Sequence, residues 1–189
     1  MNKRVIFLLL FVLFFDFNNL SWADKERQNF EYKKYSEYGK CSAKCIPTNS
    51  YGQEGETSIY RVYPENKTEQ LMSTYNWYSQ EIYLLDDCAT VVRFGPWPQG
   101  SKATKEDLAI AFYNGGLLIK EYSTLDIAGK EDNVERTVSH YNILKKVLGF
   151  RIVGGDDAIF DNEYIVFDVE TIDGRKLSFN VENGKIIIH

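Results

Sequence analysis

The sequence predicts a mainly β protein: an antiparallel β-meander, either an open propeller-like sheet or a small sandwich, with one short helix. From Tyr38 onward, short apolar runs alternate with turn residues at intervals of about ten positions, the spacing typical of a meander. Aromatic residues make up 15% of the chain, and they favour half-buried, pleated surfaces. Asn-Gly and Asp-Gly pairs, which tolerate the positive φ of tight hairpins, join several runs. The chain of 189 residues is short for a complete propeller, which needs four or more blades.

The N-terminus has the pattern of a secretory signal peptide, which we expect to span 1–23. Met1-Asn2-Lys3-Arg4 is basic, Val5 to Phe15 is apolar, and Ser21-Trp22-Ala23 supplies the small-x-small cleavage pattern. Asp16 interrupts the apolar run before it reaches the roughly 20 residues that cross a bilayer. The sequence therefore predicts a periplasmic or secreted protein with no stable membrane anchor after signal cleavage.

The remaining chain divides into a flexible lead-in over 24–37 and one β-rich domain over 38–189. The lead-in is charged and aromatic and shows no clean period. The domain is long enough to bury a core without help from disulfides or metal.

The first half of the domain contains four predicted strands that end at turn residues. A turn at Pro64-Glu65-Asn66 follows the first strand, and Gly95 to Gly100 stops the fourth, because proline cannot donate to a β-ladder. The predicted strands are Thr57 to Tyr63, Leu71 to Tyr78, Glu81 to Leu85 and Cys88 to Phe94.

The second half contains one clear hairpin and a C-terminal sheet. Asn114-Gly115-Gly116 joins Leu108 to Tyr113 with Leu117 to Tyr122. Asp173-Gly174 and Asn183-Gly184 separate three further strands, expected to form one antiparallel sheet: Tyr164 to Thr171, Lys176 to Val181 and Lys185 to His189.

The expected helix lies near 131–139. Val134 and Val138 fit a helical stripe, and Asp132 or Asn133 would cap its start. The segment 140–153 fits either a helix or a strand.

Three cysteines, an odd number, leave at least one thiol outside an intramolecular disulfide. Cys41 and Cys45 on one extended strand would lie about 13 Å apart, too far for a bridge. Cys88 is therefore the expected partner of one of them. Neither histidine falls at zinc-ligand spacing from the cysteines, so no metal is predicted.

The formal net charge of −5, with basic residues scattered along the chain, argues against nucleic acid and anionic lipid as partners. Removal of Lys3, Arg4 and Asp16 with the signal peptide makes the chain more acidic still. Gly115-Gly116 and Gly154-Gly155 lack the pattern of a phosphate loop, so no cofactor is predicted.

The predicted binding residues are Trp97, its neighbours Phe94 and Arg93, and His140. Trp97 lies between two prolines in a loop, a rigid setting for stacking on a sugar or an apolar side chain; the alternative is that it plugs the open end of a sheet, as a large aromatic next to a strand end usually does. The same two interpretations apply to Tyr75, Trp77 and Tyr78.

Catalytic patterns are weak, so the sequence favours a protein that is not an enzyme. His140 as a general base would need a nucleophile and an orienting carboxylate, and no serine lies in a Gly-x-Ser-x-Gly elbow. The acidic loop from Gly154 to Glu163 contains oxygen ligands but matches no EF-hand, and no carboxylate pair stands out for glycoside hydrolysis. Asn66-Lys67-Thr68 is formally a glycosylation acceptor, which matters only in a eukaryotic secretory route.

Three segments stand out together: Ile82 to Trp97, the hairpin continuing through Tyr122-Ser123-Thr124-Leu125-Asp126, and Val138-Ser139-His140-Tyr141. With them, the stretch from about 82 to 141 resembles a loosely defined group of exported bacterial proteins built from blade-like β-meanders. The resemblance implies a β-rich fold and export, with no established activity. Cys88 departs from the pattern, since it stands where such meanders often place glycine.

These observations predict a non-catalytic binding or interaction module of the cell envelope, with an envelope protein or glycan as partner. One alternative is an envelope hydrolase acting on glycan or peptide. The other is an inhibitor-like or structural module that pairs through an exposed sheet edge, at the strand near Ile59 or at the strand of His189.

Overall fold

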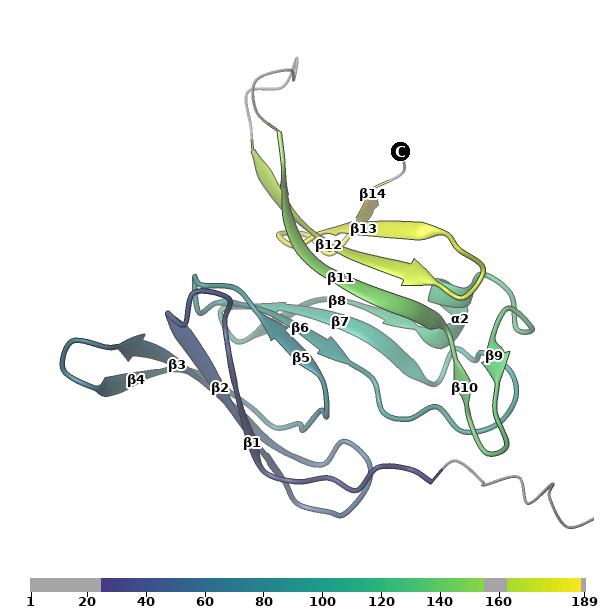
Figure 1. Cartoon of the computed structure of the whole chain (residues 1–189), viewed down its shortest axis with the longest axis horizontal. Coiled ribbons are helices and arrows are strands. Elements are labelled where there is room, and N and C mark those ends of the chain that lie inside the picture. Colours follow the sequence, from purple (N-terminus) through teal and green to yellow (C-terminus); the bar gives the residue numbers. More distant parts are fainter. Residues whose placement is uncertain (1–24, 155–162, 188–189) are drawn as a thin grey trace, which may run out of the picture.

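The computed structural model describes residues 25–154 and 163–187, so the predicted signal peptide lies outside the described residues. Its strands form antiparallel meanders that succeed one another along the chain: three four-stranded sheets and one two-stranded ribbon (Figure 1). No sheet closes into a barrel within the described ranges. The predicted fold class, mainly β with one short helix, is confirmed.

The first sheet has the order β1-β2-β3-β4. The lead-in prediction is wrong in part, because β1 pairs with β2 and Tyr32 packs against the core. The strand near Ile59 is also not an outer strand, since β3 pairs on both sides. The strands of this first sheet are β1 (Tyr32–Tyr35), β2 (Cys41–Pro47), β3 (Gly55–Tyr63) and β4 (Thr68–Tyr75).

The central sheet has the order β5-β6-β7-β8, and its two middle strands are buried on both faces. The predicted hairpin through Asn114-Gly115-Gly116 is confirmed as the β7–β8 turn, where both glycines have positive φ. The strands are β5 (Ile82–Leu84), β6 (Thr90–Phe94), β7 (Leu108–Asn114) and β8 (Leu117–Ser123).

The helix lies earlier than the sequence analysis placed it. It is α2 (Thr124–Ala128), and Ser123 and Asp126 form a capping box at its start, while Gly129 ends it in the left-handed region. The expected helix near 131–139 is wrong: turns fill most of that segment, and β9 (Glu135–Arg136) lies within it. Val134 and Val138 are spaced for a helix, but only Val134 packs against the core and Val138 is 65% exposed, so the two do not form one buried helical face.

The ambiguous segment 140–153 is extended. It contains β10 (Tyr141–Asn142), which pairs with β9, and β11 (Leu144–Val153), the first strand of the third sheet. That sheet has the order β11-β12-β13-β14, so the predicted C-terminal antiparallel sheet is confirmed. Its other strands are β12 (Tyr164–Thr171), β13 (Lys176–Asn180) and β14 (Ile186–Ile187). The outer strand β14 is short among the described residues.

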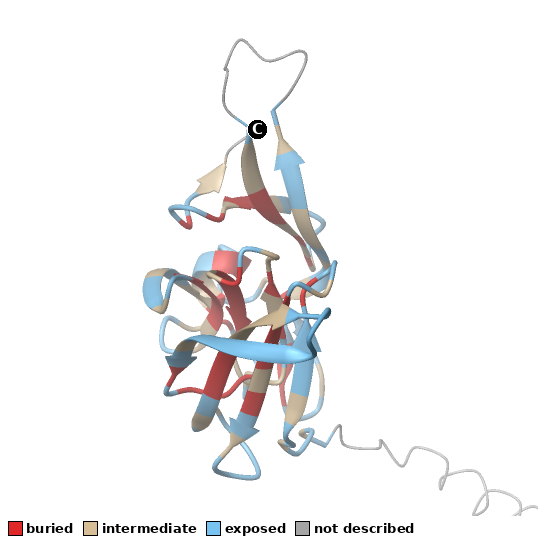
Figure 2. Cartoon of the chain, turned by 90° about the vertical axis from the view of Figure 1, so that its left-hand side faces the viewer, coloured by how far each residue is buried: buried red, intermediate tan, exposed pale blue. Residues whose placement is uncertain are grey.

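The central sheet lies between the other two four-stranded sheets (Figures 1 and 2). Successive side chains on its strands point to opposite faces, so they contribute to two separate cores. On one face, Val91 and Tyr113 pack against the first sheet, an interface we call the first interface. On the other face, Val92 and Phe112 pack against the third sheet and α2, the second interface.

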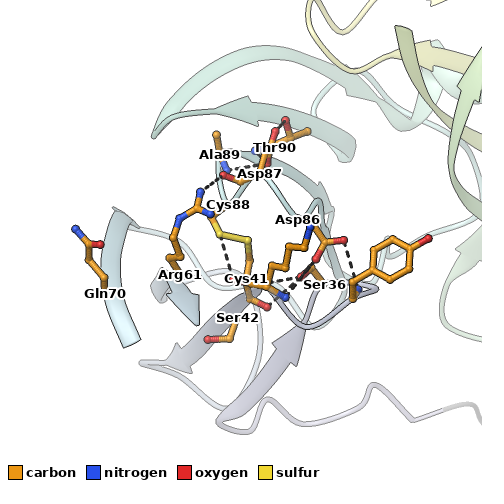
Figure 3. The surroundings of a disulfide bond; sticks show 12 residues. Ser36, Cys41, Ser42, Arg61, Gln70, Asp86, Asp87, Cys88, Ala89 and Thr90 are labelled. Carbon is orange, nitrogen blue, oxygen red and sulfur yellow. Dashed lines mark hydrogen bonds between the residues drawn. A yellow bond between two sulfur atoms is a disulfide. The ribbon is translucent and has the colours of Figure 1, made fainter. Parts of the chain in front are cut away.

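A disulfide joins the first sheet to the central sheet. Cys41 on β2 bonds Cys88 in the β5–β6 turn, with Cα atoms 5.3 Å apart, which confirms the predicted role of Cys88 (Figure 3). Cys88 has φ of 60°, so it adopts a left-handed backbone conformation that usually favours glycine. Asp86 accepts hydrogen bonds from Ser36 and the backbone across the same contact. The disulfide indicates an oxidising, extracytoplasmic compartment.

Cys45 is a free cysteine and is fully buried. Burial raises the pKa of its thiol, and hydrogen bonds with Tyr32 and Thr57 oppose that shift only in part. The thiol therefore stays protonated and unreactive at neutral pH. In the described part of the chain, no helix is long and apolar enough to cross a membrane.

Candidate functional site

The Trp97 loop begins where β6 ends, and glycine is required at its first position. A Cβ at Gly95 would lie 1.7 Å from the carbonyl oxygen of Leu108, so only glycine lets the loop pass this close to β7. The Gly95 amide donates to Ala109 at 2.9 Å, which continues the ladder one step beyond the strand. Pro96 and Pro98 then restrict the backbone on both sides of Trp97.

The imidazole of His140 packs against the indole of Trp97. The two ring centroids are 3.7 Å apart, and His140 is only 5% exposed. The His140 Nδ1 lies 2.5 Å from the hydroxyl of Thr137. Gln99 forms a β-bridge with His140, and the Tyr141 amide donates to Pro98, so both ends of the contact are anchored by backbone. Trp97 is thus half-buried and fixed in orientation.

A pocket of about 360 Å³ opens beside Trp97, where the loop before β3, strands of the central sheet and the start of β11 converge. Aromatic and aliphatic groups form much of its wall, and Gln53, Gln80 and Asn142 add neutral polar groups. Lys145 and Lys146 line it together with Glu26 and Glu81, so the formal charges around it balance. Apolar lining residues include Phe94, Trp97, Leu108, Tyr141, Ile143 and Val147.

Tyr141 lines this pocket and links three elements through its hydroxyl. It donates to Asp107 at 2.9 Å and lies 2.9 Å from the hydroxyl of Thr124, the first residue of α2. Burial is the largest influence on the Tyr141 hydroxyl and raises its pKa. The hydroxyl therefore remains a protonated donor, and its role here is to fix the pocket wall.

His140 has no carboxylate neighbour among the described residues. In the described residues, the His140 imidazole contacts a hydroxyl and an indole and lies within 4.0 Å of no carboxylate oxygen. It therefore has no orienting carboxylate of the kind that a general base uses. No cluster of metal-ligating side chains occurs in the described residues. The acidic loop lies mostly outside them, since 155–162 are not described.

The four predicted binding residues are divided between two places. Trp97 and Phe94 line the pocket, and His140 supports Trp97 from behind. Arg93 lies on the opposite face of the central sheet, because neighbours on a strand alternate. Its binding role, like that of the other three, stays a prediction.

Tyr75, Trp77 and Tyr78 are buried at the first interface, with Tyr75 and Trp77 stacked at 4.9 Å between ring centroids. Of their two interpretations, the structure favours the one in which they fill the core.

Sequence analysis missed Gln53, Tyr141 and Val147 as lining residues. Tyr141 lies in the segment for which no element was predicted, and Gln53 lies in the loop before β3, over 40 positions from Trp97. The one available signal was the aromatic Tyr141 directly after His140.

A scan against protein-family models and a search of curated proteins found no match to this chain.

Proposed function

We propose that the protein is an exported, non-catalytic binding module of the cell envelope. Its ligand would place a ring or an apolar group against Trp97 in the pocket that Trp97 lines. The observation that carries this proposal is the fixed indole: Trp97 lines the pocket while His140 and two prolines hold its orientation. A rigid aromatic face costs little conformational entropy when it binds, so stacking contributes most of its energy to affinity.

The pocket's size and lining suit a small ring-bearing ligand or a short segment of a larger one. Its volume of about 360 Å³ is at the lower end of the range for ligand sites, roughly 300–1,000 Å³. Neutral amides from Gln53, Gln80 and Asn142 offer both donors and acceptors beside the apolar wall. A sugar unit of an envelope glycan, or an aromatic or aliphatic side chain of an envelope protein, has this mixture of surfaces.

Export to the periplasm or the medium is part of the proposal. The signal-peptide pattern over 1–23 and the disulfide between Cys41 and Cys88 support it. The resemblance of 82–141 to exported bacterial proteins with blade-like meanders supports it too. On this account the three successive four-stranded sheets correspond to propeller-like blades that stack without closing a ring.

The test is a comparison of ligand binding by Trp97→Ala, Trp97→Phe and a control. Tyr38→Ala is the control, because Tyr38 is 77% exposed and does not line the pocket. Soluble glycan and peptide fragments of a bacterial envelope would be titrated into each mature protein by calorimetry. We expect Trp97→Ala to lose about tenfold in affinity, Trp97→Phe to lose less, and Tyr38→Ala to bind like wild type.

Two results would overturn the proposal. Equal affinity of the wild type and Trp97→Ala for the same fragment would remove Trp97 from the site. Release of a cleaved product from a fragment, abolished by His140→Ala, would instead favour the hydrolase.

A further inference from the structure

Arg93 is a buried cation with no anionic partner in the described part of the chain. It is 8% exposed and points from β6 into the first interface. No carboxylate oxygen of the described residues lies within 4.0 Å of its guanidinium. Every ion pair found in those residues lies instead at a partly exposed site. A buried charge is costly unless it is paired, so this position calls for an explanation.

The contacts of Arg93 are all to neutral groups. Its Nη2 donates to Oε1 of Gln53 at 2.5 Å, and its Nη1 donates to the Tyr113 hydroxyl over a long 3.4 Å. Its Cζ lies 4.6 Å from the centroid of the Trp77 ring. The cation–π contact and two neutral acceptors offset only part of the cost of removing a guanidinium from water.

Three buried nitrogen donors in this cluster have no hydrogen-bond partner among the residues that the structure describes. They are Nε of Arg93, Nε2 of Gln53 and Nε1 of Trp77. Buried polar groups normally find partners, and here the unsatisfied atoms of three touching side chains are all N–H groups. The cluster therefore lacks acceptors, and it lacks them beside a full positive charge. A carboxylate supplies both the acceptors and the charge.

Gln53 connects this cluster to the Trp97 pocket. Gln53 lines the pocket, and its side chain accepts from Arg93; it lies in the loop before β3 and is only partly buried. Phe94, next to Arg93 on β6, lines the same pocket, whereas Arg93 itself does not. The subsite proposed below requires the Gln53 side chain to rotate away so that a ligand in the pocket reaches the guanidinium. The other charges at the pocket balance, so discrimination for an anion would fall to Arg93.

We propose that Arg93 anchors a carboxylate-binding subsite at the inner end of the Trp97 pocket, closed by the Gln53 amide. The carboxylate would replace Gln53 and accept from Nε and Nη2, the fork that matches two carboxylate oxygens. This inference rests on the proposed function for the body of the ligand, and it narrows that ligand to an acid whose ring or apolar part stacks on Trp97.

The subsite itself is tested with acetate, which has a carboxylate and no ring. Thermal unfolding would be followed in acetate and in chloride at equal ionic strength. We expect acetate to raise the Tm of wild type by a few degrees and that of Gln53→Ala by more, because a ligand that binds only the folded state stabilises it. Arg93→Met should have the same Tm in both salts. Arg93→Lys keeps the charge but lacks the two-pronged guanidinium, so its Tm difference between acetate and chloride should be smaller than that of wild type.

The coupling to Trp97 is tested with benzoate and benzamide, which share a ring and differ in the carboxylate. Wild type should prefer benzoate by at least about tenfold, and Arg93→Met should lose that preference. Trp97→Ala should weaken both ligands alike while keeping the acetate effect.

The outcomes separate the two proposals. Equal Tm values in acetate and chloride for both wild type and Gln53→Ala would overturn the subsite, as would an acetate effect that persists in Arg93→Met. If wild type bound benzoate and benzamide equally and Trp97→Ala weakened both, the Trp97 pocket would be supported and the carboxylate-binding subsite would be wrong. Unchanged affinities of Trp97→Ala for both benzoate and benzamide, with the preference for benzoate kept, would retain the subsite and remove Trp97 from the site.

Discussion

On the face of the central sheet that meets the third sheet, Phe112 packs against Phe167 and Phe179. On the opposite face, Tyr113 shares its layer with a disulfide and a buried arginine. The second interface is held by aromatic contacts, such as the 5.1 Å between the centroids of Phe112 and Phe179. The first interface includes unsatisfied polar atoms. The same two strands thus present one face that stabilises the fold and one that retains polar groups at a cost.

Buried polar groups normally have partners, so the unpaired donors at the first interface are the observation on which the proposed carboxylate subsite rests. The apolar wall of the Trp97 pocket comes instead largely from residues of the second interface, such as Phe94, Tyr141 and Ile143. Each prediction below changes one side of this comparison.

The largest effect is expected from Phe167→Ala at the second interface. Phe167 is fully buried and contacts four aromatic rings, so its loss should destabilise the protein by about 3–5 kcal/mol. Urea denaturation would measure this, with Phe30→Ala as a control at a residue that is 42% exposed. Similar losses for both variants would contradict the role given to the second interface.

Removal of the disulfide by Cys41→Ser with Cys88→Ser should cost the next largest amount. The bond closes a separation of 47 residues, and its loss should destabilise the protein by about 2–4 kcal/mol. Urea denaturation of wild type with and without reductant would give the same difference. A reductant that leaves the midpoint unchanged would show that the first interface needs no covalent link.

Arg175→Ala should loosen the third sheet from α2. Nη2 of Arg175 donates to the carbonyls of Ile127 and Ala128 at 2.9 and 2.7 Å, so its removal takes a donor from both carbonyls at the end of the helix and leaves Ala128 with Asn133 Nδ2. We expect a loss of about 2 kcal/mol. Hydrogen exchange should also speed up in β13, and unchanged exchange there would argue against this link. Arg136→Ala is the control, because the side chains of Arg136 and its ion-pair partner Asp132 are both more than half exposed, and it should cost less than about 1 kcal/mol.

Acid should destabilise the protein in part through Asp173. Its partial burial alone would raise the pKa, but hydrogen bonds from Arg175, Thr171 and Asn133 outweigh this and hold the pKa below the ordinary 3.8. A depressed folded-state pKa stabilises the protein above pH 3.8, and this contribution is lost as the pH falls below it. Asp173→Asn should therefore flatten the dependence of Tm on pH below about 4. An equal slope in the variant would contradict the assignment.

The smallest effect is expected where a buried charge is removed. Arg93→Met should leave the free energy of unfolding within about 1 kcal/mol of wild type, or raise it, because an apolar side chain avoids the desolvation penalty. Phe112→Ala is the matched contrast, because Phe112 lies on the neighbouring strand β7 and faces the second interface. A loss above about 3 kcal/mol for Arg93→Met would mean that Arg93 stabilises the fold rather than a ligand.

The sequence predicted the strands best where the turn chemistry is local. Asn114-Gly115-Gly116, Asp173-Gly174 and Asn183-Gly184 all occupy turns, because glycine supplies the positive φ that these turns need. The helix prediction was wrong because it depended on the spacing of Val134 and Val138, whereas the helix begins earlier, at the capping box formed by Ser123 and Asp126.

Other features depend on contacts between distant segments. On β1, Tyr32 packs against Tyr78, with ring centroids 6.1 Å apart, and no local sequence pattern predicts this contact. Trp97 was singled out correctly as a loop tryptophan between prolines, but its pocket draws on Gln53 and Tyr141 from other segments. The environment of Arg93 was equally hidden, since a basic residue in an apolar strand gives no sign of which face it occupies.

The most direct test of this account is a ¹H–¹⁵N NMR titration of the mature protein with benzoate, in which Arg93 Nε–H and the indole N–H groups are observed separately. We predict that the signals of Arg93 Nε, Trp77 Nε1 and Trp97 shift together and saturate, while the amides of Phe167 and Phe179 at the second interface stay in place. Shifts confined to the second interface, or an Arg93 Nε signal that does not move at saturating benzoate, would contradict it.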